Sequence, residues 1–154
     1  MEICGDTPLL IGGGVGCAPL LMLGAHLKAN GITPTFLIGA RNKDLVLLED
    51  KLSVYGPVYV STDDGSYGDK GLVIDNHILK EKFSSIYTCG PLPMMKAAAA
   101  IAKEKNMPCE VSLENVMGCG IGACLCCVEK TVKGNVCVCK EGPVFNITQL
   151  LWQN

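Results

Sequence analysis

The sequence predicts an α/β protein: a parallel-sheet domain over residues 1–113, followed by a small cysteine-rich module over residues 114–154 that contains a β-hairpin. Two observations lead to this fold class. Before residue 114, short apolar runs alternate with stretches of helical length, which is typical of a parallel sheet with helices on both faces. From Glu114 onward the helical periodicity stops, and glycines and cysteines take over.

The first half of the chain contains three expected strands and two expected helices. Residues 8–11 form an apolar run that stops at glycines, so we expect a buried strand there. Residues 18–29 have helical length and composition and end at an Asn-Gly pair. A second strand is expected with its centre at residues 35–38. Asp44 is then expected to cap a helix that begins at Leu45, and a third strand is expected at residues 57–61.

The second half of the sheet domain continues the alternation. Residues 62–71 are rich in Asp and Gly and are expected to form a polar loop. Residues 72–83 have helical periodicity, and residues 84–88 are expected to form the fourth strand. The alanine-rich residues 92–106 are the clearest helix in the chain, and residues 109–113 are the fifth expected strand. In the module, two short segments that flank Lys133 and Gly134 predict the hairpin.

Composition and charge exclude several classes of protein. The net charge is −2, and the sequence has no run of basic residues that would indicate a nucleic-acid partner. Residues 7–27 carry no Lys, Arg, Asp or Glu and could span a bilayer by length, but four glycines and Pro19 favour a strand, a turn and a helix. We therefore expect no membrane partner. The first residues show no signal-peptide pattern, so the ten cysteines are expected to be free or metal-bound thiols in a reducing cytoplasm.

The spacing of four cysteines predicts an iron–sulfur site. Four residues separate Cys119 from Cys124, two separate Cys124 from Cys127, and eleven separate Cys127 from Cys139, which is the plant-type 2Fe–2S pattern. Three thiolates on one tight loop would hold one side of the cluster, and a distant strand would supply the fourth. The glycines between them let the backbone curl and point amide N–H groups at the sulfurs.

The remaining cysteines leave alternatives open. Cys126 should face away from Cys127, whereas Cys137 should share a face with Cys139 and could substitute for it as a ligand. A zinc site could instead combine Cys124 and Cys127 with Cys137 and Cys139, although it would leave Cys119 unexplained. Three further cysteines without partner spacing are interpreted as small buried hydrophobic residues: Cys4, Cys17 and Cys109.

The glycine-rich turn after the first strand suits a phosphate group. Glycines allow a close backbone approach, and the N-terminus of the next helix supplies partial positive charge, although such a turn can also simply pack tightly. The Rossmann fingerprint predicts an acidic residue at the end of the second strand. This strand ends in Gly-Ala-Arg instead, so the standard dehydrogenase variant is excluded.

The turns "GGGVGCAP", "GAR" and "CGP" together resemble the nicotinamide-binding half of the ferredoxin–NADP reductase family. The resemblance implies that the first turn faces the pyrophosphate and that the turn Cys89-Gly90-Pro91 faces the nicotinamide. It also implies that the loop after the third strand reaches the ribose, where Asp63 and Asp64 would repel a 2′-phosphate and favour NAD(H). The expected cofactor-binding residues are Gly12, Gly13, Gly14, Gly16, Ala18, Pro19, Arg41, Thr62, Asp63, Asp64, Cys89, Gly90 and Pro91.

With the tail included, the order "TDDGSYGDKG", "CGPLPMMK", "SLENVMGCGIGACLCC" and "VCKEGPVF" resembles the electron transfer subunits of dihydroorotate dehydrogenase B over almost the whole chain. This resemblance implies a carrier of electrons from NADH through FAD and the 2Fe–2S cluster. The recipient would be a partner catalytic subunit that contains FMN and oxidises dihydroorotate in pyrimidine biosynthesis, in a heterotetramer. The implied cluster ligands are Cys119, Cys124, Cys127 and Cys139.

The family places a flavin-binding barrel before the nucleotide domain, and no "RxYS"-type flavin stretch occurs in the 154 residues. A fragment, a split gene and a truncated reading frame all remain possible explanations. Two other functions stay open: a reductase subunit of another flavin and iron–sulfur complex, linked to sulfide or to a hydrogenase, and a zinc-stabilised binding module.

Overall fold

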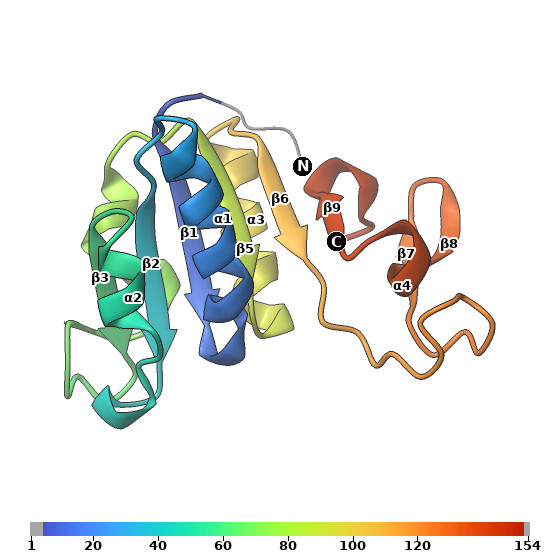
Figure 1. Cartoon of the computed structure of the whole chain (residues 1–154), viewed down its shortest axis with the longest axis horizontal. Coiled ribbons are helices and arrows are strands. Elements are labelled where there is room, and N and C mark those ends of the chain that lie inside the picture. The colour runs from blue at the N-terminus through green and yellow to red at the C-terminus, as the bar shows by residue number, and fades with distance from the viewer. Residues whose placement is uncertain (1–4, 153–154) are drawn as a thin grey trace.

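The computed structural model describes residues 5–152. Its main element is a seven-stranded sheet (Figure 1). The strands lie in the order β4-β3-β2-β1-β5-β6-β9. Every neighbouring pair is parallel except β6 and β9, so the predicted parallel sheet is confirmed. The bounds are β1 Pro8–Gly13, β2 Thr35–Ala40, β3 Val58–Thr62, β4 Asp69–Lys70, β5 Ser85–Cys89, β6 Cys109–Ser112 and β9 Val144–Asn146.

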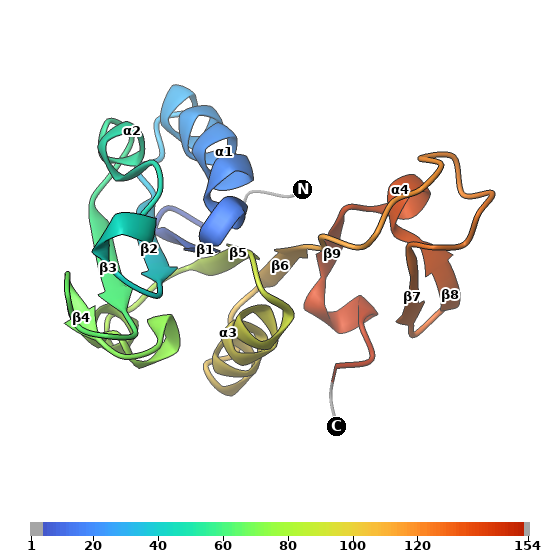
Figure 2. The ribbon, with the colours of Figure 1, turned by 90° about the horizontal axis from the view of Figure 1, so that it is seen from below.

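Helices cover both faces of the sheet. The helices α1 (Cys17–Ala29) and α2 (Glu49–Ser53) lie on one face, and α3 (Leu92–Glu104) lies on the other (Figure 2). Short 3₁₀ turns join the elements at Gly14–Gly16, Lys43–Leu45, Val73–Asp75, His77–Lys80 and Ile147–Gln149. Within residues 5–152, no helix has the length and apolar character that a membrane crossing needs.

The expected helix after Asp44 is wrong in its start and its length. Asn42 provides the cap, because its side chain accepts a hydrogen bond from the Leu45 backbone N–H at 3.2 Å, and it caps only a 3₁₀ turn. The chain then reaches Leu48, whose φ of 63° is left-handed and interrupts the helical path. The α-helix therefore begins only at Glu49.

The expected helix over residues 72–83 is also wrong. Two 3₁₀ turns replace it, and they are separated by Asn76, which is buried. The Asn76 side chain accepts from the Ile78 backbone N–H at 3.0 Å and donates to the Ser61 hydroxyl of β3 at 2.9 Å. These bonds compete with the helical pattern and tie the connection to the sheet.

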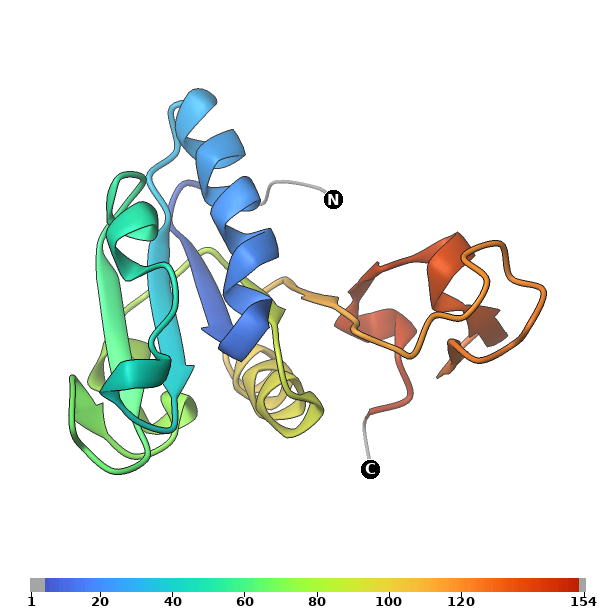
Figure 3. The same ribbon diagram turned by 60° about the horizontal axis from the view of Figure 1, so that its bottom comes forward.

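The tail after β6 returns to the edge of the sheet. Its hairpin, β7 (Val128–Thr131) and β8 (Gly134–Cys137), confirms the predicted hairpin and is followed by the short helix α4 (Val138–Glu141). The strand β9 then pairs antiparallel with β6, a connection that the sequence did not predict. The long loop between β6 and β7 lies at the end of the molecule farthest from the sheet (Figure 3).

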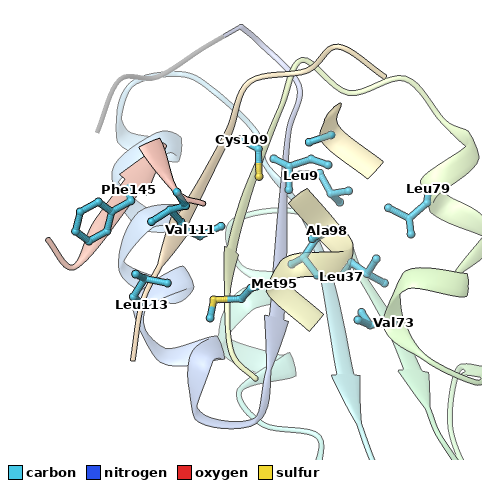
Figure 4. Packing of buried hydrophobic residues seen from close by; sticks show 14 of the residues in the cluster. Leu9, Leu37, Val73, Leu79, Met95, Ala98, Cys109, Val111, Leu113 and Phe145 are labelled. Carbon is cyan, nitrogen blue, oxygen red and sulfur yellow. The ribbon is translucent and has the colours of Figure 1, made fainter. Parts of the chain in front are cut away.

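The hydrophobic core has one layer on each side of the sheet. The layer between the sheet and α1 includes Leu10 and Phe36 from the strands and Cys17 from α1. The layer between the sheet and α3 includes Leu9 and Leu37 from the strands and Met95 from α3 (Figure 4). The tail contributes to the α3 layer through four buried residues: Cys127, Val138, Phe145 and Leu150. As predicted, Cys17 and Cys109 are buried; Cys4 lies outside the described residues.

Candidate nucleotide cleft and cysteine site

A cleft of about 500 Å³ opens at the carboxyl ends of the parallel strands, where ligands of such sheets bind. Five of the predicted residues line it: Gly13 and Gly14 from the first turn, Arg41 after β2, Asp63 after β3, and Pro91 after β5. Each of the four turns expected to contact a ligand, those after β1, β2, β3 and β5, contributes residues to the wall of this cleft.

The first turn and the turn after β5 touch through backbone atoms. A Cβ atom at Gly16 would lie 2.2 Å from the carbonyl oxygen of Cys89, and one at Gly90 would lie 2.9 Å from the carbonyl oxygen of Gly13. Gly90 also has a φ of 148°, which side chains rarely adopt. These glycines let the start of α1 approach the end of β5, so the two turns form one continuous wall.

The other predicted residues surround the cleft without lining it. Gly12 is buried within β1, whereas Ala18 and Pro19 are exposed in the first turn of α1. Thr62 is buried at the end of β3, where its hydroxyl donates to the Tyr67 carbonyl at 2.7 Å. Thr62 therefore holds the shape of the loop that carries Asp63.

The two neighbouring aspartates have different surroundings. The Asp64 carboxylate accepts hydrogen bonds from the Ser66 hydroxyl at 2.6 Å and the Ser66 backbone N–H at 2.9 Å, and these bonds lower its pKa. Asp63 lines the cleft with Arg41, and its backbone N–H donates to the Ala40 carbonyl at 3.1 Å. Asp63 thus lies at the cleft, whereas Asp64 stabilises its own turn.

The apolar residues that line one side of the cleft were not among those predicted from the sequence. Leu45, Leu47 and Leu72 come from the connections around β2 and β3, and Pro93, Met94 and Ala97 come from the start of α3. The spacing of the last three matches one face of a helix that directly follows the turn Cys89-Gly90-Pro91, so this part of the wall was detectable. The leucines carried no such signal, because they lie in irregular segments.

Cys89 is fully buried and does not line the cleft. Its thiol donates to the Oε1 atom of Glu114 at a sulfur–oxygen distance of 3.6 Å. Burial first, and then the Glu114 carboxylate, raise the pKa of the Cys89 thiol to about 11. Its role toward the nicotinamide stays a prediction. Glu114, which the sequence-based argument had used only as a boundary, is its partner.

The cysteine loop between β6 and β7 curls through left-handed residues. Gly120 and Gly122 have φ values of 71° and 79°, as expected for glycines in a tight loop, and the exposed Leu125 has a φ of 58°. The loop and the hairpin bring the four expected ligands into two pairs. The backbone N–H of Cys124 donates to the Cys119 sulfur at 3.4 Å, and the backbone N–H of Cys139 donates to the Cys127 sulfur at 3.4 Å.

These amide hydrogen bonds favour thiolates. The backbone N–H groups of Cys124 and then of Ile121 lower the pKa of the Cys119 thiol to about 6. The backbone N–H of Cys139 similarly lowers the pKa of Cys127. Metal clusters take thiolate ligands, and N–H donors to sulfur tune their potential, so this donor set fits an iron–sulfur cluster.

The four expected ligands come from two places in the fold: Cys119, Cys124 and Cys127 lie in the loop before β7, and Cys139 lies in α4. In the part of the chain that the structure describes, no three His, Cys, Asp or Glu side chains are grouped as a metal site.

The two additional cysteines differ in their surroundings. Cys126 is exposed, and its thiol donates to the Cys124 carbonyl at 3.8 Å; the expectation that it faces away from Cys127 stays a prediction. The Cys137 thiol donates to the Gly122 carbonyl at 3.7 Å. Cys137 ends β8 whereas Cys139 lies in α4, so the expectation that the two share one face of a strand, and that a strand supplies the fourth ligand, is wrong.

A glycine turn over a cleft in a parallel sheet, joined to a loop with the cysteine spacing of a metal-cluster site, is typical of an oxidoreductase module that combines a nucleotide site with a cluster site. Residues 10–100 match the family described as the oxidoreductase NAD-binding domain. Residues 114–151 match the iron–sulfur cluster binding domain of dihydroorotate dehydrogenase B. The chain therefore belongs to the oxidoreductase NAD-binding domain family and carries a cluster-binding tail.

Relatives confirm the resemblance that the motifs predicted. The chain is 43% identical over 148 residues to the probable dihydroorotate dehydrogenase B (NAD(+)), electron transfer subunit, of Methanocaldococcus jannaschii, covering 94% of this chain and 56% of that one. It is 42% identical over 155 residues to the corresponding Bacillus cereus subunit, covering 96% and 58%. This chain thus spans little more than half the length of these relatives.

A solved structure confirms the fold of the whole chain. The structure of an NADH-dependent reduced ferredoxin-NADP oxidoreductase, described for flavin-based electron bifurcation, superposes with a TM-score of 0.86 at 34% identity. It covers 99% of this chain and 56% of that one. A C-terminal domain of a Pyrococcus furiosus hydrogenase shares the fold at 16% identity, with a TM-score of 0.55 over 73% of this chain and 96% of that one.

Proposed function

We propose that this chain is the NAD(H)- and cluster-binding part of an electron transfer subunit of dihydroorotate dehydrogenase B. The observation that carries the proposal is the C-x4-C-x2-C-x11-C set of thiols on a tail that joins the sheet at β6, with backbone amides donating to the Cys119 and Cys127 sulfurs. Residues 1–113 form the nucleotide domain in this proposal, and residues 114–154 form the 2Fe–2S module.

The residues of this chain have separate tasks in the proposed function. The backbone of Gly13 and Gly14 approaches the pyrophosphate, and Asp63 accepts hydrogen bonds from the adenosine ribose hydroxyls. Gly90 and Pro91 form the wall beside the nicotinamide. The cluster is held by Cys119, Cys124, Cys127 and Cys139, and the main site of FAD is formed by residues other than these 154. Arg41 supplies positive charge near the phosphates.

The bound cofactors supply the electron transfer itself, since flavins exchange two electrons with a nicotinamide and single electrons with a 2Fe–2S cluster. Oxidation of dihydroorotate releases two electrons, and the relatives' names give NAD(+) as the acceptor. The net flow in that reaction therefore ends at NAD⁺, opposite to the direction from NADH that the motif resemblance had implied. The residues named above would bind the same cofactors in either direction of electron transfer.

The partner in this proposal is a catalytic subunit that contains FMN, in a heterotetramer in the cytoplasm. All nine described cysteines are free thiols, which suits a reducing compartment. Co-expression of the full chain with the FMN subunit and with a flavin-binding domain tests the assembly. Copurification and NAD⁺ reduction driven by dihydroorotate would support the proposal, and an assembled complex that reduces NAD⁺ only with another substrate would refute it.

A second candidate function follows from the structural match. The chain could be the corresponding part of a ferredoxin–NADP oxidoreductase complex, because the solved relative superposes over almost all of it. The two candidates differ in their partner. Copurification of a second flavoprotein that accepts electrons from ferredoxin, instead of an FMN dihydroorotate subunit, would favour this candidate.

A further inference from the structure

The fifteen residues between β6 and β7 contain no helix or strand, yet Glu114 and Asn115 near their start are anchored by hydrogen bonds. Glu114 accepts the hydrogen bond from the buried Cys89 thiol at 3.6 Å, and the Asn115 side chain donates to the Glu129 carboxylate of β7 at 3.4 Å. The segment 114–118 leads directly into the cysteine loop. Its path therefore depends on contacts with two different parts of the molecule.

The Cys89 contact leads to the nucleotide cleft. Cys89 is the last residue of β5, and Gly90 and Pro91 follow it; Pro91 lines the cleft and Gly90 packs against Gly13. A bound nicotinamide that displaced this turn would act directly on Cys89, because Gly90 and Pro91 follow it in the chain. One hydrogen bond thus joins the cleft wall to the start of the cysteine loop.

The chemistry of the pair suits a positioning contact. Glu114 is exposed, so its carboxylate loses little hydration in this position. A buried thiol tolerates the loss of its acceptor, because it behaves as a small hydrophobic group. Removing the Glu114 carboxylate should therefore release the segment without leaving a costly buried polar group, unlike most buried hydrogen bonds.

We propose that Glu114 is a positioning residue that couples occupancy of the cleft to the conformation of residues 114–118, and so to the cysteine loop. The inference rests on the proposed function, since it assumes a nicotinamide nucleotide in the cleft. It adds to that function a physical connection between the two sites, through Cys89 and Glu114.

Hydrogen–deuterium exchange of the anaerobically prepared full chain tests the coupling. Without ligand, Glu114→Ala should speed amide exchange over residues 114–118 by about fivefold, the effect of losing one modest hydrogen bond. Glu114→Gln and Cys89→Ser, which keep an acceptor and a donor, should stay close to the wild type. Glu114→Ala combined with Cys89→Ala should show no further change, because both remove the same bond.

Saturating NAD⁺ should slow exchange at residues 114–118 in the wild type and in Asn115→Ala, a control that cuts the neighbouring anchor, but not in Glu114→Ala. ADP-ribose, which lacks the nicotinamide, should protect only residues 12–19. Equal protection of residues 114–118 by NAD⁺ in the wild type and in Glu114→Ala would overturn the coupling and leave the proposed function standing. If NAD⁺ protected neither segment in the wild type, nucleotide binding and the coupling would both be refuted.

Discussion

Gly16 provides a prediction in which local propensity and tertiary packing oppose each other. It sits at the N-cap of α1 with a φ of −61° and a ψ of −11°, a conformation that alanine adopts freely. Alanine at such a position ordinarily stabilises a protein by about 0.4–1 kcal/mol, because it restricts the unfolded chain. From the helix alone, Gly16→Ala should therefore raise the free energy of unfolding.

The surroundings of Gly16 reverse this expectation. The new Cβ atom would lie 2.2 Å from the Cys89 carbonyl oxygen and 2.7 Å from the Gly90 nitrogen, both backbone atoms. Even to reach 3.0 Å, the shortest contact that real Cβ atoms show, the chains must separate by about 0.8 Å. Overpacking of this kind typically costs about 1–3 kcal/mol, so we expect Gly16→Ala to lower the free energy of unfolding by about 1–2 kcal/mol.

Urea denaturation at constant m-value measures the change, and NAD⁺ titration measures the accompanying loss of affinity as the two turns separate. Gly31→Ala is the matched control. It places a side chain at a φ of 79° in open space, so it should cost about 1 kcal/mol through backbone strain and leave NAD⁺ binding unchanged. If Gly16→Ala is as stable as the wild type and binds NAD⁺ equally well, the packing argument is wrong.

Three further predictions concern the cofactors. The reconstituted chain should bind about two irons and two sulfides. Substitution of any one expected ligand by serine (Cys119, Cys124, Cys127 or Cys139) should abolish cluster binding, whereas Cys126→Ser should not. Loss of iron in Cys126→Ser with retention in Cys119→Ser would contradict the ligand set. The complete complex should prefer NADH to NADPH, and Asp63→Ala with Asp64→Arg should narrow that preference; tighter binding of NADPH by the unmodified complex would contradict it. The isolated chain should lack tightly bound FAD and pass no electrons from NADH to a dye, which absorbance and dye reduction measure; rapid bleaching of the cluster by NADH in flavin-free protein would refute this.

Periodicity predicted the elements whose fold depends on their own sequence. Residues 8–11 are an apolar run that ends at glycines, and they became a central strand because both faces of such a strand can be buried. Residues 72–83 have an equally clear helical period, yet the buried amide of Asn76 bonds Ser61 in a distant strand and splits the helix. Tertiary partners of this kind are not visible in a local pattern.

The candidate site shows the same division. The turns around Gly13 and Pro91 could be placed at one edge of the sheet, because the carboxyl ends of parallel strands share that edge. Asp63 and Asp64 were indistinguishable by sequence, and only the hydrogen bonds from Ser66 assign one of them to the turn and leave the other at the cleft. The pairing of Cys89 with Glu114 joins residues 25 positions apart and had no local signal.

The strand β9 explains how a short cysteine-rich tail keeps a defined position beside the nucleotide domain. It has only three residues, too few for a periodic signal, but it pairs with β6 and inserts Phe145 into the core beside Val111. The Leu113 backbone N–H donates to the Pro143 carbonyl at 2.9 Å, and the Lys96 ammonium lies 6.0 Å from the centre of the Trp152 ring. These contacts attach the part of the tail that follows the cysteine loop to β6 and α3. The position of the tail beside β6 therefore depends on backbone pairing and apolar packing after the cysteine loop, and the cysteines of the loop do not have to supply it.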